Sequence, residues 1–425
     1  MRPLKAGVFY PFAPERLAPY RFRGRLRISS VAKTRVVAAM SGGVDSCVAA
    51  AMLLEQGYEV IGITMQLWNH AGDGTERFDS CCSLTDVHDA RQAAHKLGIP
   101  HYVVNYEREF KTGVVDYFAA EYAAGRTPNP CVMCNSKLKF DHLVERARAL
   151  GAEWVATGHF ARVVHHNDGR ASELYTGRDD KKDQSYFLFD MRPENLARAI
   201  FPLGDMTKAE VRAAAAKLGL HTAEKHESQE ICFVTNGRYT DFLAKHYPEV
   251  TTGRGGDIVD RAGSILGQHE GIHLFTVGQR KGLGALGPEA KYVAEIDADN
   301  NRIVVDDLEN LKVSSFNVAR VNWLVPQAEL RSDRVYTVMV RYRAKTVVCR
   351  VVPDPEDSNL WQVLLAEPAR WVTPGQAAVF YDNDRVVGGG FIAKLRGAAA
   401  AVAIGQTPGR LSAAVGRSSA DLHAT

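Results

Sequence analysis

Ser41-Gly42-Gly43-Val44-Asp45-Ser46 lies between an apolar run at residues 35–40 and an apolar helical pattern at residues 47–56 that Gly57 closes. A strand, a glycine turn and a helix in this order are typical of a phosphate-binding loop, because glycines let backbone N–H groups turn toward an anion. The serine hydroxyls and the positive end of the helix would strengthen this attraction. The stretch lacks the Gly-Lys-Ser/Thr ending of a Walker A loop, and an ordinary Ser/Gly turn before a core helix is the alternative.

The first half of the chain alternates between strand and helix patterns. Strand patterns cover residues 59–64, 101–105 and 154–157, helical patterns cover residues 86–98 and 138–150, and a capping box at Thr207 and Glu210 opens a further helix that ends at Gly219. This alternation predicts an α/β fold with a doubly wound, Rossmann-like parallel sheet over residues 35–235. In such a sheet the first turn from strand to helix is the expected nucleotide site, and the loop at residues 41–46 lies there.

The second half of the chain follows a different pattern. Glycines cluster at residues 252–256 and 277–284, which predicts a small mixed α+β module over residues 236–291. Short strand patterns separated by turn residues then cover residues 302–305, 334–343, 346–352, 361–365, 377–381 and 386–392. Their regular spacing predicts a C-terminal antiparallel β-barrel over residues 292–395.

Composition limits the class of protein and its surroundings. The 425 residues carry a formal net charge of +3, which permits a local nucleic-acid-binding patch without requiring one. No apolar run approaches the roughly 18 residues of a membrane span, and an odd number of cysteines, 7, is untypical of a secreted disulfide framework. We therefore expect a cytoplasmic protein with no membrane partner.

The two ends of the chain are expected to lie outside the core. Residues 1–34 are basic and contain prolines, which indicates a disordered extension, with a transit peptide as the alternative. Residues 396–425 are rich in alanine, glycine and serine and are expected to form a disordered tail.

Cysteines supply the second strong signal. Cys131 and Cys134 follow the stiff stretch at residues 127–130, and Cys134 lies just before a helical pattern, so a helix N-terminus would stabilise its thiolate. Cys232 lies far along the chain, in the polar stretch at residues 228–233. Three interpretations stay open at this point: buried structural cysteines, three ligands of a metal ion or a [4Fe–4S] cluster, or a redox pair in which one thiol carries sulfur.

Six motifs together point to a family. They occur, in this order, at residues 40–46, 129–135, 156–159, 182–187, 228–233 and 275–282. With these motifs the chain closely resembles the MnmA family of tRNA-specific 2-thiouridylases, within the PP-loop ATP pyrophosphatase superfamily. The resemblance covers residues 35–394, and its motifs are more specific than the PP-loop alone.

The resemblance implies a reaction and its cofactors. Members of the family are sulfurtransferases that replace the C2 oxygen of the wobble uridine with sulfur in the tRNAs for Lys, Glu and Gln, using ATP, Mg²⁺ and a cysteine desulfurase or sulfur-relay protein. Cys232 matches the persulfide carrier, and Cys134 matches its catalytic partner, which either liberates sulfide or resolves the persulfide into a transient Cys134–Cys232 disulfide. The positions that match ATP-binding residues are Ala39, Met40, Ser41, Gly42, Gly43, Val44, Asp45, Ser46, Met65 and Gly158.

The resemblance also implies positions that contact tRNA, and it contains one departure. The matching positions are Asn129, Pro130, Cys131, His159, Lys182, Asp183, Gln184, Arg341, Tyr342 and Gln376. Many relatives carry Asp where Cys131 stands, so this thiol could be a spare thiol, a further redox partner or a ligand of a [4Fe–4S] cluster shared with Cys134 and Cys232. Another PP-loop adenylating ligase and a non-catalytic RNA-binding protein are the remaining alternatives.

Overall fold

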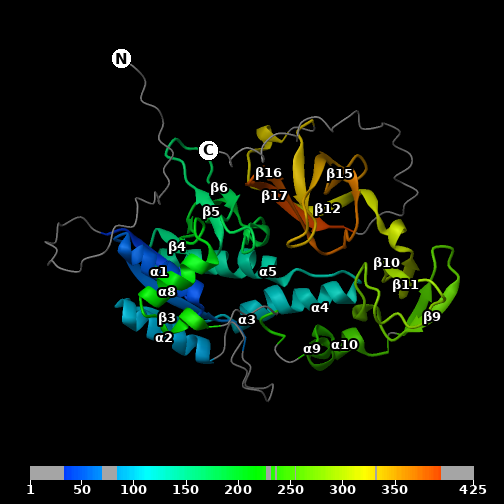
Figure 1. Ribbon diagram of the computed structural model, residues 1–425, viewed down its shortest axis with the longest axis horizontal. Coiled ribbons are helices and arrows are strands. Elements are labelled where there is room, and N and C mark those ends of the chain that lie inside the picture. The colour runs from blue at the N-terminus through cyan, green and yellow to red at the C-terminus, as the bar shows by residue number, and fades with distance from the viewer. Residues whose placement is uncertain are drawn as a thin grey trace, which may run out of the picture.

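The computed structural model describes residues 33–68, 84–225, 231–234, 237–253, 255–330 and 333–393. Three parts lie along the chain: a parallel-sheet unit, a small module that follows it, and a β-barrel (Figure 1). The expectations for most of the N-terminal extension, for the C-terminal tail and for residues 228–230 fall outside the described residues. Within the described part, no helix is long and apolar enough to cross a membrane.

The first part is the doubly wound sheet that the alternating pattern predicts. All its neighbouring strands run parallel. Its five strands lie in the order β3 (His101–Asn105), β2 (Glu59–Gln66), β1 (Arg35–Ala39), β4 (Trp154–Ala156) and β7 (Ala199–Ile200). The order reverses at β1, so the crevice of a doubly wound fold opens beside the loop that follows this strand.

Helices cover both faces of this sheet because its strands are apolar on both sides. On one face Val36 and Ala38 pack against α1 (Val44–Glu55), α2 (Leu84–Leu97) and α8 (Lys208–Lys217). On the other face Val37 joins a larger cluster that includes residues of α4 and α6. The helical segments of this side and of the connections are α3 (Glu107–Phe110), η2 (Lys111–Val115), α4 (Asp116–Ala123), α5 (Pro130–Met133), η3 (Cys134–Phe140), α6 (Asp141–Ala149), η4 (Ser185–Phe187), α7 (Pro193–Leu196) and η5 (His221–Glu224).

The central module combines two helices with a four-stranded sheet. Its elements are α9 (Tyr239–His246), α10 (Pro248–Thr251), η6 (Ile272–Leu274), and the strands β10 (Tyr292–Asp297), β11 (Arg302–Asp306), β8 (Gly256–Val259) and β9 (Ile265–His269) in sheet order. The boundary at residue 292 is therefore wrong, as is the assignment of residues 302–305 to the barrel, because β10 and β11 pair with each other and β11 pairs with β8. Spacing and composition indicate a strand but not its partner, and β8 lies more than forty residues earlier in the chain.

The C-terminal part is a closed antiparallel barrel, as predicted. Its six strands are β12 (Val313–Trp323), β15 (Leu360–Ala369), β14 (Val347–Pro353), β13 (Tyr336–Met339), β16 (Ala377–Asp382) and β17 (Arg385–Ile392), and the short helices η7 (Leu308–Leu311) and η8 (Gln327–Glu329) lie between strands in the sequence. The pairing of β12 with β17 closes the circle. The strand pattern missed β12, which is the longest strand, because polar and basic residues interrupt its apolar alternation.

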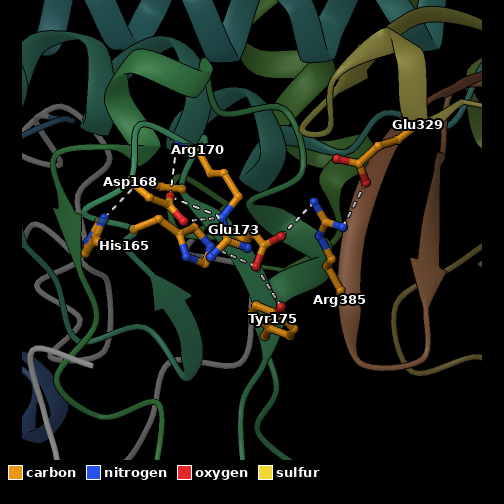
Figure 2. Close-up of polar contacts among 9 residues, drawn as sticks. His165, Asp168, Arg170, Glu173, Tyr175, Glu329 and Arg385 are labelled. Atoms are coloured by element: carbon orange, nitrogen blue, oxygen red, sulfur yellow. Dashed lines mark hydrogen bonds and ion pairs between the residues drawn. The ribbon is translucent and has the colours of Figure 1, made fainter. Parts of the chain in front are cut away.

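A hairpin of the first part extends the barrel sheet. The hairpin consists of β5 (Ala161–Val164) and β6 (Glu173–Thr176), and β6 pairs with β17. Figure 2 shows Arg385 at this joint between two carboxylates, 2.8 Å from Glu173 and 3.1 Å from Glu329. The hydroxyl of Tyr175 also donates to Glu173, at 2.9 Å. Backbone pairing and ion pairs thus fasten the barrel to the part that carries the phosphate-binding loop.

Candidate active site

The loop between β1 and α1 is shaped by its own serines. The Ser46 hydroxyl donates to the carbonyl of Gly43 at 3.0 Å and accepts from the backbone N–H of Ser41 at 3.1 Å. Gly42 has a φ of +74°, and a Cβ there would lie 2.1 Å from the carbonyl oxygen of Asp86 in α2. Only glycine fits this position, so the loop packs directly on the first turn of α2.

Two contacts fix the loop against neighbouring strands. The Thr64 hydroxyl of β2 donates to the carbonyl of Met40 at 2.6 Å. A Cβ on Gly158, which follows β4, would lie 2.8 Å from the backbone of Asp45 and of Ser46. The glycine therefore lets the chain after β4 close over the N-terminus of α1, where an anion would bind.

A cavity of about 320 Å³ opens beside this loop. Its size is at the lower end of the range for small-molecule sites, roughly 300–1,000 Å³. All the predicted ATP-binding residues except Gly42 line it. The other lining residues are Ile63, Leu67, Asp86, Lys139, Thr157, His159, Gln184, Lys208 and Lys225.

Three lysines of the cavity were missed by the sequence analysis. Lys208 lies 2.7 Å from one carboxylate oxygen of Asp45 and 2.8 Å from the other. Lys225 lies 2.6 Å from Asp86, and Lys139 donates to an amide oxygen of its own helix at 3.0 Å. The lining thus combines three lysines with the carboxylates of Asp45 and Asp86, and Asp89, outside the lining, also pairs with Lys225. Lysines at this position can bind an anionic ligand.

One of these lysines could have been predicted. Thr207 caps α8, as its sequence motif indicates, and Lys208 is the first residue of this helix. Because α8 follows β7 in a doubly wound sheet, its N-terminus is expected at the carboxyl edge of the strands, beside the nucleotide. Lys225 lies in irregular sequence and offers no comparable signal.

His159 lies inside the site and not on the surface. Its side chain is buried, lines the cavity and makes a 2.7 Å hydrogen bond with the hydroxyl of Thr157. Burial, together with the charge of Lys139, holds the pKa of His159 well below its usual range. The imidazole is therefore neutral near pH 7 and can offer a hydrogen bond without bringing a charge.

Cys134 does not lie at a helix N-terminus, contrary to the sequence-based expectation. The helix begins at Pro130, which occupies the first helical position, with Asn129 as the N-cap, so Cys134 lies one turn inside it. A side chain at this depth gains little from the unpaired N–H groups of the first turn. The stiff stretch at residues 127–130 thus ends with Pro130, the residue that starts the helix.

The three cysteines that could hold a cluster differ in their surroundings. Cys131 is exposed, Cys134 is buried and Cys232 is half-buried. Over the described residues, no group of three or more His, Cys, Asp or Glu side chains is arranged to hold a metal ion. The arrangement does not fit an iron–sulfur cluster, so we derive no step through one.

Cys232 lies in a tight turn that is fixed by its neighbour. The backbone N–H of Val234 donates to the carbonyl of Ile231 at 2.8 Å, with Cys232 and Phe233 between them. Phe233 is only 1% exposed and packs among aromatic rings of the core. The turn thus holds the partly accessible thiol of Cys232 next to the buried side chain of Phe233.

Comparison with known proteins decides the family. Over 363 residues the chain is 49% identical to the tRNA-specific 2-thiouridylase MnmA of Geotalea uraniireducens, and this match covers 85% of the chain and 95% of the relative. The MnmA of Magnetococcus marinus is 50% identical over 359 residues, covering 84% and 98%. The chain belongs to the MnmA family of tRNA-specific 2-thiouridylases. Family models for a tRNA methyl transferase HUP domain, a tRNA methyl transferase PRC-barrel domain and an aminomethyltransferase β-barrel domain match residues 34–236, 240–307 and 313–392.

Several positions that the MnmA resemblance assigns to tRNA meet where the barrel touches the first part. The Tyr342 hydroxyl donates to the carbonyl of Asp183 at 3.1 Å, and Arg343 donates to the carbonyl of Lys181 at 2.7 Å. Arg341 is exposed in the same barrel loop, and the partly exposed Lys182 lies in the opposing turn. These two loops form one basic surface from parts of the chain about 160 residues apart.

Three of the assigned positions mainly support local structure. The carboxylate of Asp183 accepts from the N–H of Gly177 at 2.8 Å, and the Gln184 side chain accepts from the N–H of Phe160 at 2.9 Å. Gln376 of the barrel donates to the carbonyls of Thr127 and Pro128, at 3.1 and 3.0 Å. This last contact ties the barrel to the stretch that leads into the Cys134 helix. A role of these residues in binding tRNA stays a prediction.

Proposed function

We propose that this protein catalyses the ATP-dependent 2-thiolation of the wobble uridine of tRNA. The observation that carries the proposal is the position of η3, which supplies both Cys134 and Lys139. Lys139 lines the cavity beside the loop at residues 41–46, which we call the nucleotide cavity. A single helical segment therefore joins Cys134 to the cavity that we expect to bind ATP. This arrangement supports activation by ATP followed by a sulfur transfer in which Cys134 takes part.

The first step activates the base. The uridine C2 oxygen attacks the α-phosphorus of ATP, a bond forms between that oxygen and phosphorus, and the bond to the β-phosphate breaks to release pyrophosphate. Backbone N–H groups of residues 41–46 and the cations Lys208 and Lys225 stabilise the charge that moves onto the leaving group. His159, held neutral by burial, can orient the base by a hydrogen bond.

The second step delivers sulfur. The terminal sulfur of a persulfide on Cys232 attacks C2, a carbon–sulfur bond forms, and the C2–oxygen bond breaks to release AMP. The Cys134 thiolate then attacks the Cys232 sulfur, which frees the thiolated base and leaves a disulfide that an external dithiol must reduce. In the other order, Cys134 attacks first and liberates sulfide, which then attacks C2.

The partners follow from this chemistry. A cysteine desulfurase, directly or through a relay protein, loads the persulfide, and a reducing cytosol suits the thiols. Mg²⁺ would accompany the ATP phosphates and screen their charge. Asp45 of the loop would supply a carboxylate ligand for this ion. The basic surface formed by residues 181–182 and 341–343 is suited to a phosphate backbone.

Mass spectrometry of the anticodon fragment tests the proposal. The protein is incubated with unmodified tRNA, ATP, Mg²⁺, cysteine, a desulfurase and a dithiol, and the tRNA is then cut into oligonucleotides by a ribonuclease. We expect 2-thiouridine at the wobble position and one pyrophosphate per sulfur inserted. Pyrophosphate release that needs no tRNA and survives in the Cys134→Ser/Cys232→Ser double variant would instead support a PP-loop ligase acting on a small molecule.

A further inference from the structure

The two described ends of the segment that leads to Cys232 are each anchored in a different part of the molecule. Lys225 lies at the nucleotide cavity, and Phe233 is buried eight residues later, next to Cys232. Lys225 also stabilises the leaving group in the first step, and Phe233 lies directly beside the sulfur carrier. Each makes contacts that reach across several elements.

Lys225 joins the phosphate-binding loop to α2 and to its own segment. Its ammonium lies 2.6 Å from the carboxylate of Asp86, 2.5 Å from that of Asp89 and 3.2 Å from the carbonyl oxygen of Gly42. Arg212 of α8 donates to the carbonyl of Lys225 at 3.2 Å and so holds its backbone. Burial lowers the pKa of Lys225, but hydrogen bonds and charges from the two carboxylates together outweigh burial and raise this pKa, so Lys225 stays a cation.

Phe233 fixes the turn that carries Cys232. Its ring centroid lies 5.2 Å from that of Phe118, 5.7 Å from that of Phe110 and 5.2 Å from that of Phe242. The first two rings belong to the helical stretch at residues 107–123, and the third belongs to α9 of the central module. The first two pairs pack edge to face, which is worth about 0.5–1.5 kcal/mol per pair beyond burial, and the third pair is tilted, so the ring is held from several sides.

We propose that Lys225 and Phe233 are positioning residues that hold Cys232 in register with the activated base. Lys225 ties one end of the segment to the loop that binds the phosphates, and Phe233 ties the other end to the aromatic cluster beneath the thiol. This inference rests on the proposed function, because it assigns the geometry of the second step. Sulfur transfer needs a reacting sulfur within about 3–3.5 Å of C2, and a shift of about 1 Å can cost roughly 100-fold in rate.

The two anchors predict different defects. Phe233→Ala should lower single-turnover formation of 2-thiouridine by about 100-fold while tRNA-dependent pyrophosphate release stays within a few-fold of the unsubstituted rate. Phe233→Leu, which keeps most of the buried volume, should show the same uncoupling to a smaller extent. Lys225→Met should raise the KM for ATP and slow pyrophosphate release as well, and Lys225→Arg should restore both in part.

Quantifying pyrophosphate and 2-thiouridine in the same single-turnover reaction, with pre-loaded persulfide, tests the proposal. Controls are Lys217→Met, an exposed lysine at the end of α8, and Phe316→Leu, a buried ring of the barrel core. Both should keep the ratio of 2-thiouridine to pyrophosphate. Equal losses of both products in the two Phe233 variants, or no loss in either, would overturn the positioning role. A lack of 2-thiouridine in the unsubstituted protein would instead overturn the proposed function itself.

Discussion

Single residues of the phosphate-binding loop are dictated by backbone geometry as well as by chemistry. Gly42 has a positive φ and faces the backbone of α2, whereas Gly57, at the end of α1, has a φ of +90° with open space around it. Both glycines thus have a left-handed backbone conformation, but only Gly42 also lacks space for a Cβ. A left-handed conformation costs an L-residue about 1–2 kcal/mol, and a clash with backbone adds to this cost.

Gly42→Ala should therefore be more damaging than Gly57→Ala. We expect Gly57→Ala to lower the free energy of unfolding by about 1–2 kcal/mol without changing ATP affinity. Gly42→Ala should destabilise the protein further and weaken ATP binding, because the loop must move away from Asp86. Urea unfolding and calorimetric titration with ATP measure the two effects, and equal ATP affinities in the two variants would contradict the account of the loop.

The buried histidine of the cavity predicts a pH dependence of stability. The pKa of His159 is well below its usual range in the folded protein, while in the unfolded chain it is about 6.5. As pH falls through 6.5, the unfolded state binds a proton that folded His159 does not, so stability falls, by up to about 1.4 kcal/mol per pH unit. Between pH 7.5 and 5.5, His159→Gln should lose less stability than the unsubstituted protein, and parallel curves from urea unfolding would contradict this.

Helices and strands could be predicted from the sequence where local signals mark both their pattern and their ends. Strands β1 to β4 of the parallel sheet and the capped helix α8 could be predicted because their apolar pattern and their capping residues agree, whereas β7 is only two residues long and leaves no pattern. The start of the Cys134 helix could not, because Pro130 and the residues before it are equally typical of a turn and of a helix N-terminus. The ion pair between Arg385 and Glu173, which joins β17 to β6, depends on a pairing more than 200 residues apart that no local pattern contains.

The ion pair between Arg385 and Glu173 predicts a measurable interaction energy between β17 and β6. Both side chains are at most 17% exposed, and breaking a buried pair by removing one partner costs up to about 3–5 kcal/mol. Arg385→Met should approach this cost, whereas Glu173→Gln/Arg385→Met should be less destabilised than the sum of its single variants. Unfolding measurements on the four proteins give the interaction energy, and simple additivity would show that the pair does not couple the two strands.

At the scale of the whole molecule, one apolar cluster joins the three parts. It contains residues of the parallel sheet, of α9 in the central module and of β16 in the barrel. The sequence predicts each part by its pattern, but contacts between parts, such as the barrel loop at residues 341–343 resting on residues 181–183, emerge only in three dimensions. For the same reason the strand, glycine turn and helix around residues 41–46 could be predicted and the lysines around them largely could not.

The basic surface formed by these loops predicts how tRNA binding depends on salt. Arg341→Ala should weaken tRNA binding, and it should reduce the slope of log K against log[salt] by about 1, because one phosphate contact is lost. Arg148→Ala, an exposed residue on α6, serves as the control and should leave the slope unchanged. Filter binding over a range of salt concentrations measures both slopes, and an unchanged slope for Arg341→Ala would place the tRNA backbone elsewhere.

In the proposed reaction the loop at residues 41–46 activates the base, and Cys232 replaces its oxygen with sulfur. Rapid-quench measurement of pyrophosphate and 2-thiouridine with the Cys232→Ser variant, tRNA and ATP separates these two roles. We expect a tRNA-dependent burst of about one pyrophosphate per enzyme and no 2-thiouridine, because activation is complete and the sulfur carrier is missing. Formation of 2-thiouridine by this variant, or the absence of a burst in both this variant and the unsubstituted protein, would contradict these roles.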